Sequence, residues 1–408
     1  MAGSPLLPVT DALAQILASA QRPLEAETIP LAQANGRILA SDLAAMRTQP
    51  PAPLSAMDGY AVRRADIETV PATLKLTGTS AAGHGFAGKV CQGETVRIFT
   101  GAPLPDGADT IVIQEDTEAD GDRIVMKESE PLGRHVRLAG LDFKKGDVLL
   151  KAGRRMGPAE LALAAAMNHP AVPVARKPKV ALLATGDELV PPGVEPGPDQ
   201  IVASNNFAVA ALVERAGGAV LDLGIAGDNF PAIESAIRRA REAGADILVT
   251  LGGASVGDHD LVQSALKNEG MELGFWRIAM RPGKPLMHGR IGETRILGLP
   301  GNPVSAIVCA ILFLVPLVKA LTGDPHAGED PSIPGVLGAG MKENDNRQDY
   351  VRARLSGLSQ GIATATPFTR QDSSMLGVLA DAQGLIIRPP FAPAAHAGDA
   401  CRVILMNA

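Results

Sequence analysis

The feature that most constrains the fold is an alternation of short apolar runs with amphipathic segments between about residues 179 and 323. The apolar runs are typical of buried strands, and the segments between them repeat apolar residues at helical spacing. One such stripe is Val209, Leu212, Val213 and Ala216, and another is Ile233, Ala236, Ile237 and Ala240. This alternation predicts a doubly wound parallel sheet with helices on both faces.

Five apolar runs are predicted to be the strands of this sheet: VALLAT, AVLDLGI, DILVTLG, FWRIAM and RILGLP. Ligands of an open parallel sheet bind beyond the carboxyl ends of its strands, where the following helices begin. The segments that follow the five runs are GDEL, AGDN, GASVGDHD, RPGKP and GNPVS, respectively. We therefore expect these segments to share one edge of the sheet and to form the functional site.

The flanking regions have a different pattern, in which short β-type runs alternate with glycine and proline. A chain of 408 residues is long enough for several domains. The predicted fold class is therefore α/β plus β, with the following division. Residues 1–45 and 140–176 form a helical or mixed connecting domain, 46–139 a small β domain, 177–325 the α/β domain and 326–408 a C-terminal β domain.

Composition argues against several functional classes. Lys and Arg total 38 against 44 Asp and Glu, and aromatic residues are 3% of the chain, which is not typical of a nucleic-acid binder. The three cysteines are far apart and lack metal-ligand spacing, as in a protein of the reducing cytoplasm. The N-terminus lacks the features of a signal peptide, and the uncharged run 304–318 is too short to span a bilayer. We expect a cytoplasmic protein that binds neither nucleic acid nor a membrane.

The stretch TLGGASVGDHD combines small residues with two aspartates. The small residues that could form an amide-lined phosphate cup are Gly252, Gly253, Ser255 and Gly257. Asp258 and Asp260 could then hold Mg²⁺ against that phosphate, because magnesium prefers carboxylate and phosphate oxygens. The alternative is an ordinary glycine turn whose aspartate caps the next helix, and the stretch alone does not decide between the two.

Other carboxylates are expected at the same edge. Asp187 and Glu188 follow the first predicted strand, and Asp228 follows the second. Taken singly, each fits a loop turn or a helix cap. Several carboxylates at one edge repel each other unless a cation or protons compensate. Their convergence, rather than any single residue, indicates a cation-dependent site.

A second anion site is expected beside the first. Two prolines stiffen the RPGKP loop, which projects Arg281 and Lys284 as an anion clamp. In GNPVS, Asn302 can cap the following helix, and Ser305 adds a hydroxyl near its positive end. The pattern is typical of a well-formed helix start, which is compatible with anion binding.

The order of motifs across nearly all of the chain resembles the molybdopterin molybdenumtransferase family, which includes the E domain of gephyrin. The motifs are SAMDGYAV, FTGAPLP, GLDFKKGD, TGDEL, GGASVGDHD, RPGKP, GLPGNPVS and QDSS. The resemblance implies an enzyme that inserts molybdate into adenylylated molybdopterin and releases AMP, with Mg²⁺ required. It also implies a homodimer of elongated four-domain subunits, in which each active site lies between the α/β domain of one subunit and a β domain of the other.

The resemblance also assigns residues. It implies catalytic roles for Asp58, Asp142 and Glu188. It implies contacts with substrate or metal for a larger set: Thr100, Asp228, Asp260, Arg281, Lys284, Ser305, Arg352 and Ser373. The family often has lysine where this chain has Arg281, and a guanidinium keeps the charge but changes the donor geometry.

Two other functional classes remain open from the sequence. A molybdopterin adenylyltransferase or a nucleotide pyrophosphatase could use the same central domain, but the additional domains with SAMDGYAV and GLDF weigh against both. A non-catalytic scaffold would not need the acidic strand ends and both cationic loops. A molybdopterin adenylyltransferase is also a candidate partner.

Overall fold

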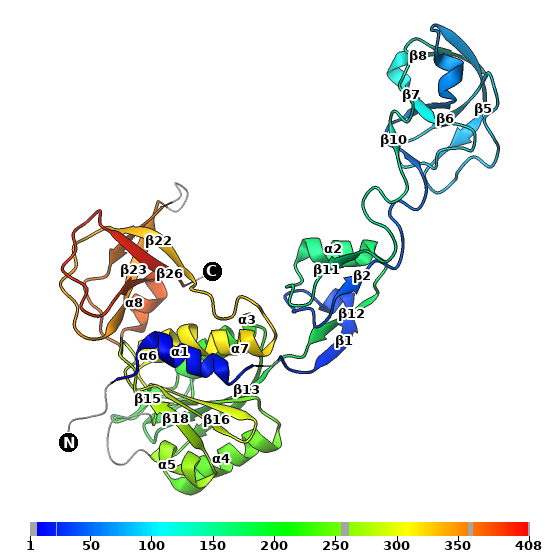
Figure 1. The fold of residues 1–408 in the computed structure, drawn as a ribbon. Helices are drawn as coiled ribbons and strands as arrows, with labels where there is room; N and C mark the ends of the chain where they lie inside the picture. Colours follow the sequence, from blue (N-terminus) through cyan, green and yellow to red (C-terminus); the bar gives the residue numbers. More distant parts are fainter. Residues whose placement is uncertain (1–5, 22, 254–260, 358–361, 407–408) are drawn as a thin grey trace. The chain divides into compact units, whose positions relative to one another are not determined.

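The computed structural model describes residues 6–21, 23–253, 261–357 and 362–406 (Figure 1). The chain forms two compact units, which are treated separately below. Unit 1 comprises Met1–Glu27, Gly36–Ala40 and Val174–Ala408, and unit 2 comprises Thr28–Asn35 and Ser41–Pro173.

The central sheet of unit 1 has six strands in the order β16-β13-β17-β21-β20-β18. Their bounds are β13 Lys179–Thr185, β16 Ala219–Ala226, β17 Ile247–Leu251, β18 Glu272–Trp276, β20 Met287–Ile291 and β21 Thr294–Leu299. The strands β16, β13, β17 and β21 are parallel, whereas β20 and β18 are antiparallel to their neighbours. The sheet is therefore mixed, with a parallel part that carries four of the predicted strands.

Helices pack on both faces of this sheet. Along β13, Val180 and Leu182 face one apolar core, whereas Ala181 and Leu183 face the other. The first core contains α1 Val9–Ala18, α3 Asn205–Arg215, α6 Pro303–Cys309 and α7 Val315–Leu321. The second core contains α4 Phe230–Glu242 and α5 Leu261–Asn268. Figure 1 shows α4 and α5 on the opposite side of the sheet from α1, α6 and α7.

The run FWRIAM does not form the expected parallel strand. It is interrupted at Arg277, whose φ of 141° ends the extended conformation after Trp276. β18 pairs with β20 instead, which joins β21 through a two-residue turn with Gly292 at φ 55°. RPGKP therefore does not follow a parallel strand of the sheet, and the prediction that it does is wrong.

A continuous helical segment connects this sheet to the C-terminal part of unit 1. It runs through α6, the π-helical turn Ala310–Leu314 and α7. Pro316 lies in the first turn of α7, and the wider turn before it accommodates a residue without an amide hydrogen. The run Pro303–Leu321 is long and apolar enough by composition to cross a membrane, but 67% of it is buried inside the structure. This burial is typical of the core helix of a folded unit.

The C-terminal part of unit 1 is a small barrel. Its sheet has the order β19-β23-β24-β22-β26-β25, and β25 also pairs with β23, which closes the ring. The bounds are β19 Met280–Arg281, β22 Ser332–Leu337, β23 Gln348–Ser356, β24 Ala363–Pro367, β25 Gly384–Arg388, β26 Ala400–Leu405 and α8 Leu376–Asp381. A short parallel pair, β14 Leu189–Val190 and β15 Ile201–Val202, follows β13 along the chain.

Unit 2 is built mainly from a six-stranded sheet in the order β7-β4-β6-β5-β9-β8. The bounds are β4 Gly59–Val62, β5 Ala72–Ser80, β6 Glu94–Ile98, β7 Thr110–Ile113, β8 Thr117–Asp120 and β9 Arg123–Met126. Smaller pairs are β2 Leu43–Ala44 with β11 Val148–Leu150, and β3 Leu54–Ser55 with β10 Val136–Arg137. The remaining elements of unit 2 are α2 Pro158–Ala166 and the short helices η1 Leu31–Gln33, η2 Arg64–Ile67 and η3 Gln114–Asp116. The strands β1 Ala26–Pro30 and β12 Ala171–Ala175 pair with each other, and each has residues in both units.

Candidate functional site

A cavity of about 770 Å³ lies in unit 1 at the carboxyl ends of β13, β17 and β21. Its wall includes Glu188 after β13, Gly252 and Gly253 after β17, and Asn302 after β21. Asp228, which follows β16, also lines it. The cavity thus lies at the edge where an open α/β sheet binds its ligands.

Two acidic turns are linked at this edge. The amide of Asp228 donates to Asp187 Oδ1 at 3.0 Å, and the amide of Asp187 donates to Asp228 Oδ2 at 3.4 Å. Gly186 has φ 145°, which side chains rarely adopt, and the Glu188 carboxylate folds back against the place where a Cβ atom would lie. Backbone geometry therefore gathers carboxylates from the turns after β13 and β16, as the strand-end rule predicted. Oxygen ligands of this kind suit a hard cation such as Mg²⁺.

The turn after β17 requires glycine. Gly252 and Gly253 have φ values of 103° and 64°, and a Cβ atom at Gly253 would overlap the side chain of Val262. The Gly252 amide already donates to the carbonyl of Leu299 at 3.2 Å. The predicted phosphate cup therefore depends on the residues after Gly252. Ser255 and Gly257, together with the predicted metal residues Asp258 and Asp260, lie outside the described residues.

The start of α3 contributes cavity residues that sequence reasoning missed: Ser204, Asn205 and Asn206. The Asn205 side-chain amide donates to the carbonyl of Gly301 at 2.8 Å, which links α3 to the GNPVS turn. The signal was present, because serine and asparagine before a helical stripe are typical of a helix start. A helix of this domain that starts after a strand can direct such residues to the same edge.

The GNPVS turn differs in part from expectation. Asn302 occupies the position before α6, but its side chain makes no capping hydrogen bond within the described residues. Ser305 is buried, with 4% of its surface exposed. The amide of Val304 donates to the carbonyl of Ser373 at 3.1 Å, so part of the donor capacity of this helix start is used inside unit 1. Anion contacts of Asn302 and Ser305 stay predictions.

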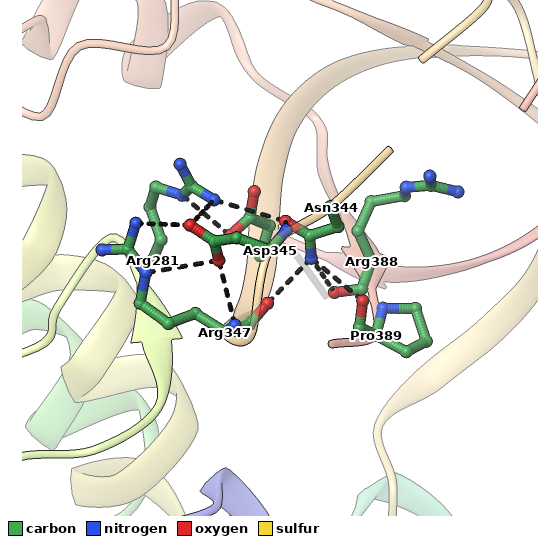
Figure 2. Close-up of polar contacts among 7 residues, drawn as sticks. Arg281, Asn344, Asp345, Arg347, Arg388 and Pro389 are labelled. Atoms are coloured by element: carbon green, nitrogen blue, oxygen red, sulfur yellow. Dashed lines mark hydrogen bonds and ion pairs between the residues drawn. The ribbon is translucent and has the colours of Figure 1, made fainter. Parts of the chain in front are cut away.

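The two cations of RPGKP have different surroundings. Figure 2 shows Arg281 within a group of polar residues of the C-terminal barrel, where it forms ion pairs with Asp345 and Asp349. Lys284 is exposed, and its ammonium makes no ion pair or hydrogen bond with the residues that the structure describes. Pro285, the next residue, lines the cavity. Lys284 is therefore available to an anion, whereas Arg281 is already paired.

Arg352 is a structural anchor in this state. Its side chain is buried, and its guanidinium donates to the carbonyls of Asp372 at 2.9 Å and Met375 at 3.2 Å. These bonds hold the segment that contains Ser373 and supplies Ser374 to the cavity wall. Burial also lowers the pKa of Arg352. Direct substrate contacts of Arg352 and Ser373 stay predictions.

Unit 2 brings together two residues that only the family resemblance had singled out. Asp58 Oδ1 accepts hydrogen bonds from the amide of Thr100 at 2.7 Å and from its hydroxyl at 2.8 Å. These bonds lower the pKa of Asp58. The pairing of β4 with β6 places the two residues side by side, although they are 42 positions apart. Asp142 is exposed in the same unit, and its amide donates to the carbonyl of Gln49 at 3.0 Å.

Comparison with known proteins matches family models along most of the chain. The models are the MoeA N-terminal region (domain I and II) at residues 7–168, the probable molybdopterin binding domain at 181–320 and the MoeA C-terminal region (domain IV) at 334–406.

Relatives of known name share most of their length with this chain. A molybdopterin molybdenumtransferase of Haemophilus influenzae is 36% identical over 348 residues, which are 85% of each chain. Molybdopterin molybdenumtransferase 2 of Mycobacterium tuberculosis is 33% identical over 400 residues, which are 95% of this chain and 97% of that one. The solved structure of a molybdopterin biosynthesis MoeA protein from Pyrococcus horikosii matches with a TM-score of 0.85 and 31% identity, over 99% of this chain and all of that one. The chain therefore belongs to the molybdopterin molybdenumtransferase family and is a transferase.

Proposed function

We propose that this enzyme inserts molybdate into adenylylated molybdopterin and releases AMP, in a reaction that depends on Mg²⁺. The observation that carries the proposal is the cavity at the strand ends, which two carboxylates and a glycine turn line. Adenylylated molybdopterin joins a pterin to AMP through a pyrophosphate, and molybdate is a second anion. A site for this pair needs room for a large substrate and donors for two anions, and the cavity with Lys284 beside it offers both.

Each group of the chain has a distinct role in this proposal. Lys284 attracts the oxyanion, because its ammonium has no partner among the described residues. Glu188 and Asp228 lie where the pyrophosphate is cleaved, and Glu188 is the group that moves a proton. The Asp58–Thr100 pair supplies an ionised carboxylate, because the hydrogen bonds from Thr100 favour the charged form.

The described donors fit a magnesium ion held together with substrate. No group of three or more potential ligands is present among the described residues. Mg²⁺ is usually retained by one or two carboxylates and substrate phosphates, so Glu188 and Asp228 are a sufficient protein contribution. Asp258 and Asp260 are the further ligands that the sequence predicts. The bound ion would neutralise charge on the phosphoanhydride.

The proposal includes the setting of the enzyme. We propose the four-domain division given by the sequence with one change: α1 Val9–Ala18, which was expected in the connecting domain, belongs to the α/β domain because it packs in the core of that domain's sheet. We also propose a homodimer in the cytoplasm and a molybdopterin adenylyltransferase as the partner that supplies the substrate. The odd number of cysteines without a metal-ligand pattern supports a reducing compartment.

The test is AMP release by the purified chain with adenylylated molybdopterin, molybdate and Mg²⁺. Glu188→Gln should lower the rate by about a hundredfold or more, because the amide cannot exchange a proton. Glu195→Gln is the matched control, since Glu195 is exposed, lies seven positions further along and is not part of the cavity wall. Equal rates for Glu188→Gln and the control would remove the cavity carboxylate from the mechanism. Absence of AMP with the unmodified chain would reject the reaction.

A further inference from the structure

The RPGKP loop is joined to the C-terminal barrel through β19. β19 pairs in parallel with β23, and Arg281 lies opposite Asp349 in the register. The amide of Gln348 donates to the carbonyl of Ala279 at 2.9 Å, which extends the pairing. The loop that carries both candidate cations is therefore built on the barrel as well as on the central sheet.

The Arg281 side chain strengthens this junction with three contacts. Its Nε donates to Asp349 Oδ1 at 2.9 Å, and its Nη2 lies 3.2 Å from Asp345 Oδ2 and 3.3 Å from Asn344 Oδ1. A planar guanidinium can address acceptors in two directions at once. A lysine ammonium presents its donors from one point and would lose part of this set.

The acceptors around Arg281 are themselves fixed (Figure 2). The Asn344 side-chain amide donates to the carbonyls of Arg347 at 2.8 Å, Arg388 at 3.1 Å and Pro389 at 2.9 Å. Arg347 Nη2 donates to Asp345 Oδ2 at 2.8 Å. Two guanidinium groups thus face two carboxylates, so the group is balanced in charge without any ligand.

The charges around Arg281 differ from those around Lys284, the other cation of the loop. An oxyanion that approached Arg281 would meet the carboxylates of Asp345 and Asp349, which repel it. Lys284 has no such neighbours among its contacts, and its carbonyl accepts the amide of Ile278 at 3.0 Å, which fixes the loop backbone. Gly283 also packs on Cys309 of α6 so closely that a side chain at this position would collide.

We propose that Arg281 is a positioning residue for the substrate anion: it clasps the RPGKP loop to Asp345 and Asp349 of the barrel, and Lys284 alone supplies the charge of this loop to the anion. The inference rests on the proposed function where it names molybdate as that anion. It assigns opposite tasks to two cations only three positions apart.

A double-mutant cycle tests the proposal with Arg281→Met, Asp349→Asn and the combination. Hydrogen exchange of the β19–β23 amides and molybdate binding by calorimetry are both measured. Either single change should speed exchange and weaken molybdate binding by about two- to fivefold, the range expected for a partly exposed ion pair. The double variant should exchange no faster, and bind molybdate no more weakly, than the more affected single variant, because both changes break the same clasp.

A direct contact between Arg281 and the anion gives the opposite pattern. Asp349→Asn would then free the guanidinium and tighten molybdate binding, while Arg281→Met would weaken it without a change in exchange. That result would overturn the proposal, as would unchanged exchange in both single variants. Asp345→Asn repeats the test at an exposed position should Asp349→Asn fail to fold.

The conservative variant Arg281→Lys provides a further arm. If Arg281 acts as a clasp, the β19–β23 amides of Arg281→Lys should exchange as fast as those of Arg281→Met, because one ammonium cannot replace the several donors of the guanidinium. If the β19–β23 amides of Arg281→Lys were as protected from exchange as in the unmodified chain, the clasp would be contradicted. The exchange and calorimetry arms need no turnover, so an inactive unmodified chain would reject the proposed function without deciding this inference.

Discussion

Asp345 and Asp349 contact the same guanidinium but bind protons differently. Hydrogen bonds from Arg347, together with the charges of Arg281 and Arg347, lower the pKa of Asp345 to about 2. Burial raises the pKa of Asp349 above its ordinary value, despite the ion pair with Arg281. The folded pKa of Asp345 lies below the unfolded one, so its stabilising contribution is present above about pH 4 and is lost as the pH falls toward 2. The pKa shift of Asp349 has the opposite sign, because its ionised form is disfavoured in the folded state, and ionisation of Asp349 therefore lowers the stability of that state.

On acidification, Asp349 is therefore expected to protonate before Asp345. Carbon-detected NMR of the two carboxyl groups should give a higher midpoint for Asp349 and a midpoint near 2 for Asp345. Asp345→Asn should remove the part of the acid-induced loss of barrel stability that falls between about pH 4 and pH 2. Midpoints in the reverse order would show that burial does not dominate at Asp349.

The backbone directly after β17 depends on a glycine, and the chain contains a matched control. Gly253 and Gly244 have φ values of 64° and 67°, but only at Gly253 would a Cβ atom meet another side chain, that of Val262. Gly244→Ala should lower the free energy of unfolding by about 1 kcal/mol through backbone strain alone. Gly253→Ala should lower it by a further ~1–3 kcal/mol and disturb the cavity wall. Urea denaturation of both variants measures the difference, and equal losses would contradict the role given to Val262.

The elements that the sequence predicted best are those whose pattern is local. Periodicity located β13, β16, β17 and β21, and the strand-end rule then placed Glu188 and Asp228 at one edge. Periodicity could not show that FWRIAM is divided between two sheets, because the break depends on the backbone angle of Arg277. It also could not predict β20, whose partners follow from a hairpin turn.

Local sequence patterns could not predict contacts between residues that lie far apart in the chain. Asp58 and Thr100 meet through the pairing of β4 with β6, and only the family resemblance suggested that they act together. Arg281 meets Asp345 and Asp349 because β19, which follows β18 of the central sheet along the chain, pairs with β23 in the barrel. The sequence located the cationic loop but did not show which of its cations is already paired.

At the scale of the whole molecule, the candidate residues fall into two sets. Glu188, Asp228 and Lys284 belong to unit 1, whereas Asp58 and Thr100 belong to unit 2. The family resemblance implies that each active site takes its residues from two subunits. In a homodimer of this kind, a defect in one set can be complemented by a partner chain that is intact in that set.

Mixing inactive variants tests this arrangement. Asp58→Ala and Lys284→Ala chains should each be nearly inactive alone. After subunit exchange in equal amounts, activity should recover to about one quarter of the unmodified level, since half of the dimers are mixed and each mixed dimer has one intact site. The structure supplies the control, because Asp58 and Thr100 are hydrogen-bonded within unit 2 and must serve the same site. Asp58→Ala mixed with Thr100→Ala should therefore stay at the mean of the two variants. Recovery in neither mixture, after native mass spectrometry has confirmed exchange, would place Asp58 and Lys284 in a site within one subunit. Recovery in both mixtures would show that Asp58 and Thr100 do not serve the same site.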